Sequence, residues 1–126
     1  MILGLGTDIC RIDRVERFLE RYGARFTSRC FTAREIEQME RYRHPAEHYA
    51  AMIAAKEAAS KALGTGWRQG VHWKCFEVDH ESSGKPFLRI VGRAAEIASR
   101  MGVRGTHVSL THDAGVAMAT VIFEGE

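Results

Sequence analysis

An alanine-rich stretch carries the side chains that are best suited to do chemistry. Residues 53–64 read Ile-Ala-Ala-Lys-Glu-Ala-Ala-Ser-Lys-Ala-Leu-Gly, and because alanine is the best helix former the stretch predicts a helix. Glu57 and Lys61 are four residues apart, so they share one side of that helix. A carboxylate beside an ammonium, among small side chains that leave room for a ligand, suits a site for a metal ion and a phosphate. The alternative is an ordinary surface ion pair.

A second carboxylate follows the apolar opening of the chain, Met-Ile-Leu-Gly-Leu-Gly-Thr-Asp. This run predicts a strand over residues 2–5, with Asp8 where the strand would stop. A rigid strand end can present Asp8 to a ligand, and a helix N-cap or a turn is the alternative interpretation of its position. Gly4 and Gly6 have no third glycine at the spacing of a dinucleotide-binding fingerprint, and no helix follows them directly, which excludes that type of site.

Three motifs in this order resemble a known enzyme family. They are Gly-Thr-Asp at residues 6–8, Ala-Lys-Glu-Ala-Ala-Ser-Lys-Ala-Leu-Gly-Thr-Gly at residues 55–66 and His-Val-Ser-Leu-Thr-His at residues 107–112. Together they are similar to the short, AcpS-type 4′-phosphopantetheinyl transferases, the holo-acyl-carrier-protein synthases. Gly-Lys-Pro at residues 84–86 also matches, and the resemblance spans residues 2–124.

The resemblance implies an enzyme that moves the 4′-phosphopantetheine arm of coenzyme A to a serine of apo acyl carrier protein, in fatty acid biosynthesis. Adenosine 3′,5′-bisphosphate is the leaving group. Mg²⁺ is the natural catalyst at a pyrophosphate, because it takes one or two carboxylates plus phosphate oxygens and waters. Asp8 and Glu57 stand at the family's metal positions, and Lys61 matches its phosphate-contacting lysine. The general base is either a metal-bound water or one of these carboxylates.

Further residues match the family's coenzyme site. His107 and Ser109 share one face of a predicted strand, because alternate side chains of a strand point the same way. Gly64 and Gly66 allow close backbone approach to a phosphate, or they simply end the helix. The coenzyme-binding residues that the resemblance implies are Lys61, Gly64, Gly66, Pro86, His107, Ser109, Arg43 and His44. The chain departs from the family at Met52, where the family often has an arginine that contacts the coenzyme phosphate.

A basic segment lies between Arg11 and Arg34, with seven arginines against three acidic residues. Apolar residues recur at helical spacing within it, so it predicts an amphipathic helix from Asp13 to Tyr22 or Phe26. The basic face beside the apolar stripe suits the docking of an acidic partner, and the resemblance implies that this partner is an acyl carrier protein. The alternative is that this face contacts only solvent. The predicted partner-binding residues are Arg14, Arg17, Arg21 and Arg25.

Length and composition limit the other possibilities. The 126 residues predict a single domain, residues 1–126, without a membrane-spanning segment or a secretory signal. Three widely spaced cysteines favour free thiols in the cytoplasm. The net charge of +2 does not favour nucleic acid as a partner. The best non-enzymatic alternative is a binding module for coenzyme A or a carrier protein, which performs no turnover.

The predicted fold is α+β, with a small, mainly antiparallel sheet packed on one face against helices. The resemblance implies the 4′-phosphopantetheinyl transferase fold and a homotrimer, in which subunits cover the other face of the sheet and form active sites between them. After the basic helix we expect helices and strands in the following order: a helix over 33–43, a helix over 45–63, strands over 73–78 and 86–90, a helix over 92–101 and a hairpin of 106–111 with 116–123.

Overall fold

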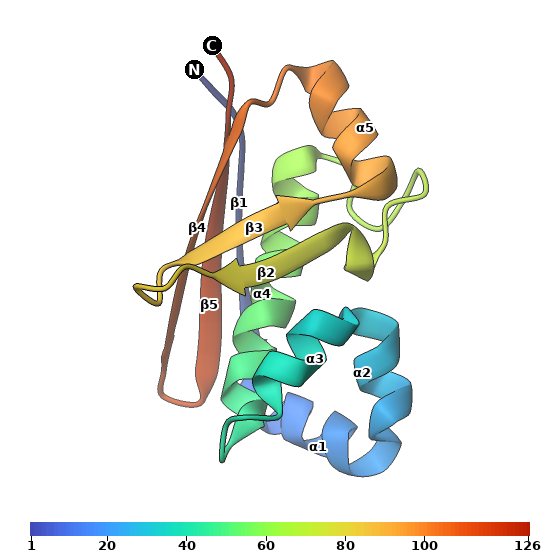
Figure 1. Ribbon diagram of the computed structural model, residues 1–126, viewed down its shortest axis with the longest axis vertical. Helices are drawn as coiled ribbons and strands as arrows, with labels where there is room; N and C mark the ends of the chain where they lie inside the picture. The colour runs from blue at the N-terminus through green and yellow to red at the C-terminus, as the bar shows by residue number, and fades with distance from the viewer.

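Five α-helices and two antiparallel sheets make up the structure, a computed structural model that describes residues 1–126 (Figure 1). The elements in chain order are β1 (Ile2–Arg11), α1 (Ile12–Tyr22), α2 (Ala24–Cys30), α3 (Ala33–Met39), α4 (Pro45–Leu63), a 3-10 turn (Trp73–Cys75), β2 (Phe76–His80), β3 (Pro86–Ile90), α5 (Gly92–Met101), β4 (Gly105–Asp113) and β5 (Val116–Glu124). The predicted α+β class and the antiparallel pairing are confirmed.

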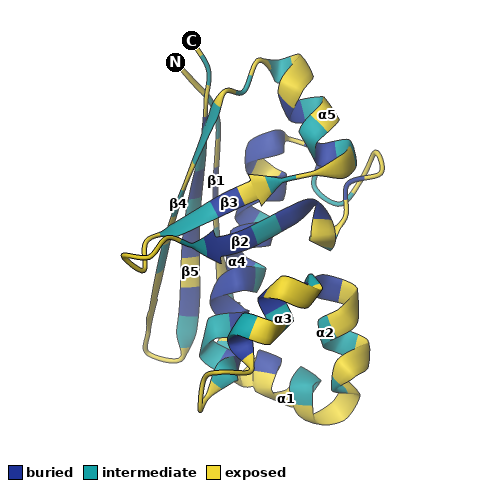
Figure 2. Ribbon diagram, viewed as in Figure 1, coloured by how far each residue is buried: buried dark blue, intermediate teal, exposed yellow.

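The larger sheet has the strand order β1-β5-β4, and β2 pairs with β3 in a separate hairpin. Helix α4 packs against one face of the larger sheet, and the β2–β3 hairpin crosses in front of this helix (Figure 1). Helix α4 is therefore enclosed, and most of its residues are buried (Figure 2). Alanine suits this position because its small side chain lets neighbouring elements approach a helix on several sides.

Strand β1 and helix α4 pack backbone against backbone. A Cβ atom on Gly4 would lie 2.1 Å from the carbonyl oxygen of Ala62, and one on Gly6 would lie 1.8 Å from that of Ala58. Real Cβ atoms do not come this close to another atom, so only glycine fits at both positions. This close approach holds the side chain of Asp8, two residues along the same face of β1, beside α4.

The opposite face of the larger sheet is uncovered in a single chain. Leu5, Ile9 and Met118 lie on it and are 63%, 64% and 39% exposed. The alternate residues of β5, among them Val121 and Phe123, point toward α4 and are fully buried. The sheet thus has an apolar outer face that no element of the same chain covers.

Several predicted boundaries are confirmed. The Thr32–Glu35 capping box begins α3, Pro45 begins α4, and Gly64 ends α4 in the left-handed conformation. The β2–β3 turn, helix α5 and the β4–β5 hairpin also lie where the sequence predicted them.

Of the two ends predicted for the basic helix, Tyr22 is confirmed and Phe26 is wrong, because Gly23 adopts positive φ and separates α1 from α2. Three other boundaries were predicted wrongly. Strand β1 continues to Arg11, so Asp8 lies within the strand and not at its end. Helix α3 ends at Met39 and not near Arg43. Finally, Trp73 begins a 3-10 turn that precedes β2.

Helix α1 begins at Ile12, one residue before the Asp13 start that the sequence predicted, and its N-cap Arg11 makes no side-chain hydrogen bond. The Asp13 carboxylate instead accepts a hydrogen bond of 2.8 Å from the Arg11 guanidinium.

Candidate active site

The predicted catalytic residues of β1 and α4 lie together in the structure. Lys61 Nζ donates a hydrogen bond of 2.8 Å to Asp8 Oδ1 and one of 3.1 Å to the carbonyl of Thr7. Asp8 reaches α4 because it follows Gly6 on the inner face of β1, where its partner on β5 is the buried Ala119. The hydrogen bond to Asp8 raises the pKa of Lys61, so this lysine remains a cation at neutral pH.

Glu57 lies one helical turn before Lys61 and shares its cavity with Asp8. Burial raises the pKa of Glu57, and the nearby Asp8 carboxylate raises it further, while the Lys61 ammonium acts in the opposite direction. The indole Nε1 of Trp67 is itself buried and has no hydrogen-bond partner. Two carboxylates in one site repel each other unless a cation lies between them.

The donor set fits a hard divalent cation. Asp8 and Glu57 supply two carboxylates to one cavity, and no group of three or more His, Cys, Asp or Glu residues gathers anywhere in the chain. Mg²⁺ binds through one or two carboxylates and completes its octahedron with waters and substrate phosphates, whereas structural zinc needs about four protein ligands. If a metal binds here, the residues that would hold it are therefore Asp8 and Glu57.

A cavity of about 510 Å³ extends from these carboxylates between β1, α1, α2 and α4. Its walls are mainly apolar, and Arg11 and Arg14 bring positive charge to it. Such a cavity places a reacting group beside the carboxylates while much of its wall excludes water. The lining residues are Asp8, Ile9, Cys10, Arg11, Arg14, Val15, Phe18, Phe26, Cys30, Ile53, Glu57 and Trp73.

Gly64 and Gly66 follow directly after the helix that carries Glu57 and Lys61. The N–H of Gly64 donates to the carbonyls of Ser60 and Lys61, and the N–H of Gly66 donates to that of Ser60. Their predicted capping role is confirmed. A Cβ atom on either glycine would meet nothing within 4 Å, so the backbone here is also open to a ligand.

The other predicted coenzyme-binding residues lie apart from the carboxylates within one chain. His107 and Ser109 lie on β4, which β5 separates from β1, and they point to the uncovered face of the sheet. His44 caps the far end of α4, 13 residues before Glu57, which corresponds to about 20 Å along the helix. Arg43 precedes it and is exposed, and Pro86 begins β3.

The predicted partner-binding arginines come from two helices because of the break at Gly23. Arg14, Arg17 and Arg21 lie on α1 and Arg25 lies on α2, and all four are exposed. The Arg14 guanidinium lies 5.5 Å from the ring of Phe18, and that of Arg21 lies 5.6 Å from the ring of Tyr22. A cleft of about 280 Å³ adjoins them and is lined by Phe18, Tyr22, Arg25, Phe26 and Arg29.

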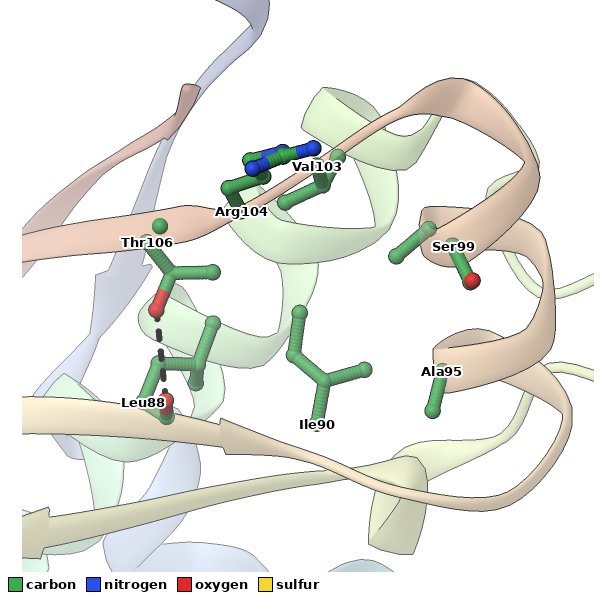
Figure 3. A pocket seen from close by; sticks show the side chains of 9 residues that line it. Leu88, Ile90, Ala95, Ser99, Val103, Arg104 and Thr106 are labelled. Atoms are coloured by element: carbon green, nitrogen blue, oxygen red, sulfur yellow. Dashed lines mark hydrogen bonds between the residues drawn. The ribbon is translucent and has the colours of Figure 1, made fainter. Parts of the chain in front are cut away.

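A separate cavity of about 250 Å³ lies between α5, β3 and the start of β4 (Figure 3). Thr106 Oγ1 donates a hydrogen bond of 3.3 Å to the carbonyl of Leu88 at its floor, and Arg104 lies at its edge. None of the predicted site residues lines it, and it holds no carboxylate. It is therefore distinct from the candidate active site.

Sequence reasoning missed the environment of Lys56 and the role of Glu35. Lys56 lies in the alanine-rich stretch, but its side chain and that of Glu35 are fully buried and form an ion pair of 2.8 Å. It also did not predict Trp67 next to Glu57. The only available signal was the capping box, which places Glu35 at a helix start but gives no information on its second partner.

Comparison with known proteins agrees with this geometry. A sequence model of the 4′-phosphopantetheinyl transferase superfamily matches residues 4–121. The chain belongs to this superfamily. It is 48% identical over 124 residues to the holo-[acyl-carrier-protein] synthase of Solibacter usitatus, covering 98% of this chain and 99% of that protein. It is 49% identical over 123 residues to that of Vibrio vulnificus, covering 98% of each. The family predicted from the motifs is thereby confirmed.

Solved structures of such synthases share the fold. The enzyme from Neisseria meningitidis superimposes with a TM-score of 0.89 at 31% identity, covering 98% of this chain and 99% of that one. The enzyme from Helicobacter pylori, solved in complex with coenzyme A, gives a TM-score of 0.84 at 26% identity, covering 95% and 99%. In this chain no helix has the length and hydropathy needed to cross a bilayer.

Proposed function

We propose that this chain transfers 4′-phosphopantetheine from coenzyme A to a serine of apo acyl carrier protein, with Mg²⁺ at Asp8 and Glu57. The observation that carries the proposal is the shared cavity of these two carboxylates with Lys61 hydrogen-bonded to one of them, in a chain of the transferase superfamily. Holo-[acyl-carrier-protein] synthases are the relatives that match it along nearly the whole chain. Coenzyme A bound to the Helicobacter pylori synthase supports the choice of donor.

The reaction forms a P–O bond to the serine oxygen and breaks the bond to the oxygen of adenosine 3′,5′-bisphosphate. The Mg²⁺ ion supplies positive charge at the pyrophosphate when bound. Lys61 stabilises the negative charge that develops on the leaving phosphate, and its half-exposed side chain lies one helical turn from Glu57. The serine proton leaves as the new bond forms, and either a metal-bound water or one of the two carboxylates accepts it.

The carrier protein docks on α1 and α2 in this proposal. The exposed arginines of these helices supply positive charge, and the aromatic cleft beside them supplies apolar contacts. Arg14 joins this surface to the catalytic cavity, because it lines the cavity and also lies over the ring of Phe18. A serine on a carrier bound to α1 is therefore presented close to Asp8 and Glu57.

We further infer that the enzyme is a homotrimer with active sites between subunits. Two features of one chain support this. Leu5, Ile9 and Met118 leave the outer face of the sheet apolar and uncovered, as expected of a face that packs against another copy. His107 and Ser109 lie on that same face, away from Asp8 of their own chain. The active site that they complete is therefore that of an adjacent subunit.

The free cysteines suit the reducing cytoplasm.

Intact-mass spectrometry tests the activity. An apo acyl carrier protein is mixed with this chain and coenzyme A, either with Mg²⁺ or with a chelator. The proposal predicts a carrier that gains one phosphopantetheine only when Mg²⁺ is present. The alternative, a binding module without turnover, predicts an unchanged carrier mass in both samples. Equal transfer in the chelator sample would contradict the metal assignment and leave the transferase intact.

A further inference from the structure

A fully buried ion pair lies directly behind the candidate active site. Lys56 Nζ donates to Glu35 Oε1 at 2.8 Å, to the carbonyl of Trp73 at 3.1 Å and to the carbonyl of Phe76 at 2.5 Å. The same ammonium lies 5.5 Å from the ring of Phe31. Each of its three N–H bonds therefore has an acceptor, and no water is needed to satisfy it.

Glu35 is equally saturated. Its Oε1 accepts a hydrogen bond from the N–H of Thr32 as well as from Lys56, and its Oε2 accepts one from the N–H of Val78. Both side chains are inaccessible to solvent. The pair thus ties α3, α4, the 3-10 turn and β2 to one another through directional bonds.

Stability alone is a weak reason for such a pair. Taking two charges out of water costs several kcal/mol per ion, and apolar residues of similar volume often serve a core equally well. Burial lowers the pKa of Lys56, although the Glu35 carboxylate opposes this effect. Alanine, which fills most other buried positions of α4, would have avoided this penalty. Unlike apolar packing, the hydrogen bonds of this pair fix the direction in which the Lys56 side chain points.

The direction matters because Lys56 immediately precedes Glu57. Successive residues of an α-helix are about 100° apart around its axis. Bonds that point Lys56 at Glu35 and β2 therefore fix the rotation of α4 that turns Glu57 toward β1 and Asp8. The second acceptor of Lys56 is the carbonyl of Trp73, and the side chain of Trp73 lines the cavity that holds Glu57.

We propose that Lys56 and Glu35 are positioning residues for the metal-binding carboxylates. They hold α4 at the rotation that brings Glu57 to Asp8, and they hold Trp73 in the cavity wall. This inference rests on the proposed function, since it concerns how the proposed metal site is assembled. Neither residue touches the substrate, so both act through Glu57.

The test compares a charge-free pair with a control of ordinary core damage. The double variant Glu35→Gln with Lys56→Met leaves no charge buried. It therefore retains more stability than Lys56→Met alone, which leaves the Glu35 carboxylate buried without a counter-ion. Leu88→Ala is the matched control, because it removes buried apolar volume from β3 without touching Lys56 or Glu35. For each folded protein, thermal melting, the Mg²⁺ concentration at half-maximal transfer, and kcat and KM for the carrier are measured. Mn²⁺ binding in the presence of coenzyme A is followed by electron paramagnetic resonance.

Positioning predicts that the double variant is folded, that it binds Mn²⁺ about 10-fold or more weakly, and that its kcat falls by a similar factor. KM for the carrier stays unchanged, because α1 and α2 are intact. Leu88→Ala melts at a lower temperature but keeps wild-type metal binding. A double variant with wild-type Mn²⁺ binding and kcat would overturn the inference.

A second variant keeps the inference testable if the double variant does not fold. Lys56→Arg keeps the cation and its pairing with Glu35, but the longer side chain displaces α4, so metal binding weakens in a folded protein. Wild-type Mn²⁺ binding in folded Lys56→Arg would also overturn it. The Mn²⁺ measurement needs no carrier and no turnover. An inactive wild-type protein would therefore refute the proposed function but not the positioning inference. The comparison of Mn²⁺ binding between the wild-type protein and the variants tests that inference separately.

Discussion

Gly6 and Ala58 bring strand β1 and helix α4 into direct backbone contact, with room for no side chain between them. A Cβ atom on Gly6 would lie 1.8 Å from the Ala58 carbonyl oxygen. Because Asp8 lies two residues after Gly6 and Glu57 lies one residue before Ala58, this contact fixes the separation of the two carboxylates. These small residues thus help to set the geometry of the proposed metal site.

Gly6→Ala tests this relationship. The added methyl group must push β1 away from α4, and we expect a loss of about 3 kcal/mol in the free energy of unfolding. The folded fraction should also need far more Mg²⁺ for transfer. Chemical denaturation and Mg²⁺ titration measure the two effects. Gly105→Ala is the control, since a Cβ atom there would meet nothing within 4 Å. A Gly6→Ala protein with wild-type stability would show that β1 and α4 are not held at this distance.

Much of this architecture could be predicted because local signals determine it. The Thr32–Glu35 capping box, Pro45 and Gly64 mark helix ends by their own chemistry, and the structure places these ends where the sequence did. Asp8, Glu57 and Lys61 were identified from motif order, and they are indeed neighbours.

The remainder depends on contacts that sequence spacing does not encode. Strand β1 runs past Asp8 because β5 pairs with it as far as Arg11. The basic helix breaks at Gly23, since glycine adopts the positive φ that the turn between α1 and α2 requires. The burial of Lys56 follows from α3 and β2 packing against α4, and an alanine-rich pattern gives no hint of it.

The rate of transfer should depend on pH through Glu57. Its pKa is raised from the ordinary 4.5 by burial and by Asp8, so the carboxylate takes up a proton at a higher pH than usual. Only the ionised form binds metal. The rate of transfer is therefore at its maximum above this raised pKa, and it falls as the pH drops through that pKa. Because metal and proton compete, more Mg²⁺ should shift the acid limb of the kcat/KM profile to lower pH. An acid limb that Mg²⁺ does not move would argue against Glu57 as a ligand.

Charge reversal at the proposed carrier surface should act on binding and not on chemistry. Arg21→Glu with Arg25→Glu places negative charge on α1 and α2, and we expect KM for an acidic carrier to rise about 10-fold at low salt with kcat nearly unchanged. The difference should shrink as ionic strength increases. Arg100→Glu on α5 is the matched control, because Arg100 is also an exposed arginine in a last helical turn. Equal effects of both changes would place the carrier elsewhere.

Mixing two impaired variants tests whether sites form between subunits. Glu57→Ala removes a proposed metal ligand, and His107→Ala removes a proposed coenzyme contact on the outer face of the sheet. If each site takes these residues from different subunits, trimers assembled from an equal mixture regain about a quarter of the intact sites, because each neighbour is drawn at random from two variants. Transfer is measured at coenzyme A concentrations below KM, where the loss of His107 is most visible. Activity no greater than the average of the separate variants would mean that one chain supplies both residues.

Asp8 and Glu57 together hold the metal ion of the transferase in the proposed mechanism. Crystals grown with coenzyme A and Mn²⁺, with data collected at the manganese absorption edge, test it most directly. We expect an anomalous peak in contact with carboxylate oxygens of both residues and with a phosphate oxygen of the coenzyme, and we expect Glu57→Gln to abolish this peak. An ordered coenzyme with no peak between Asp8 and Glu57, or with the metal held by other residues, would contradict it.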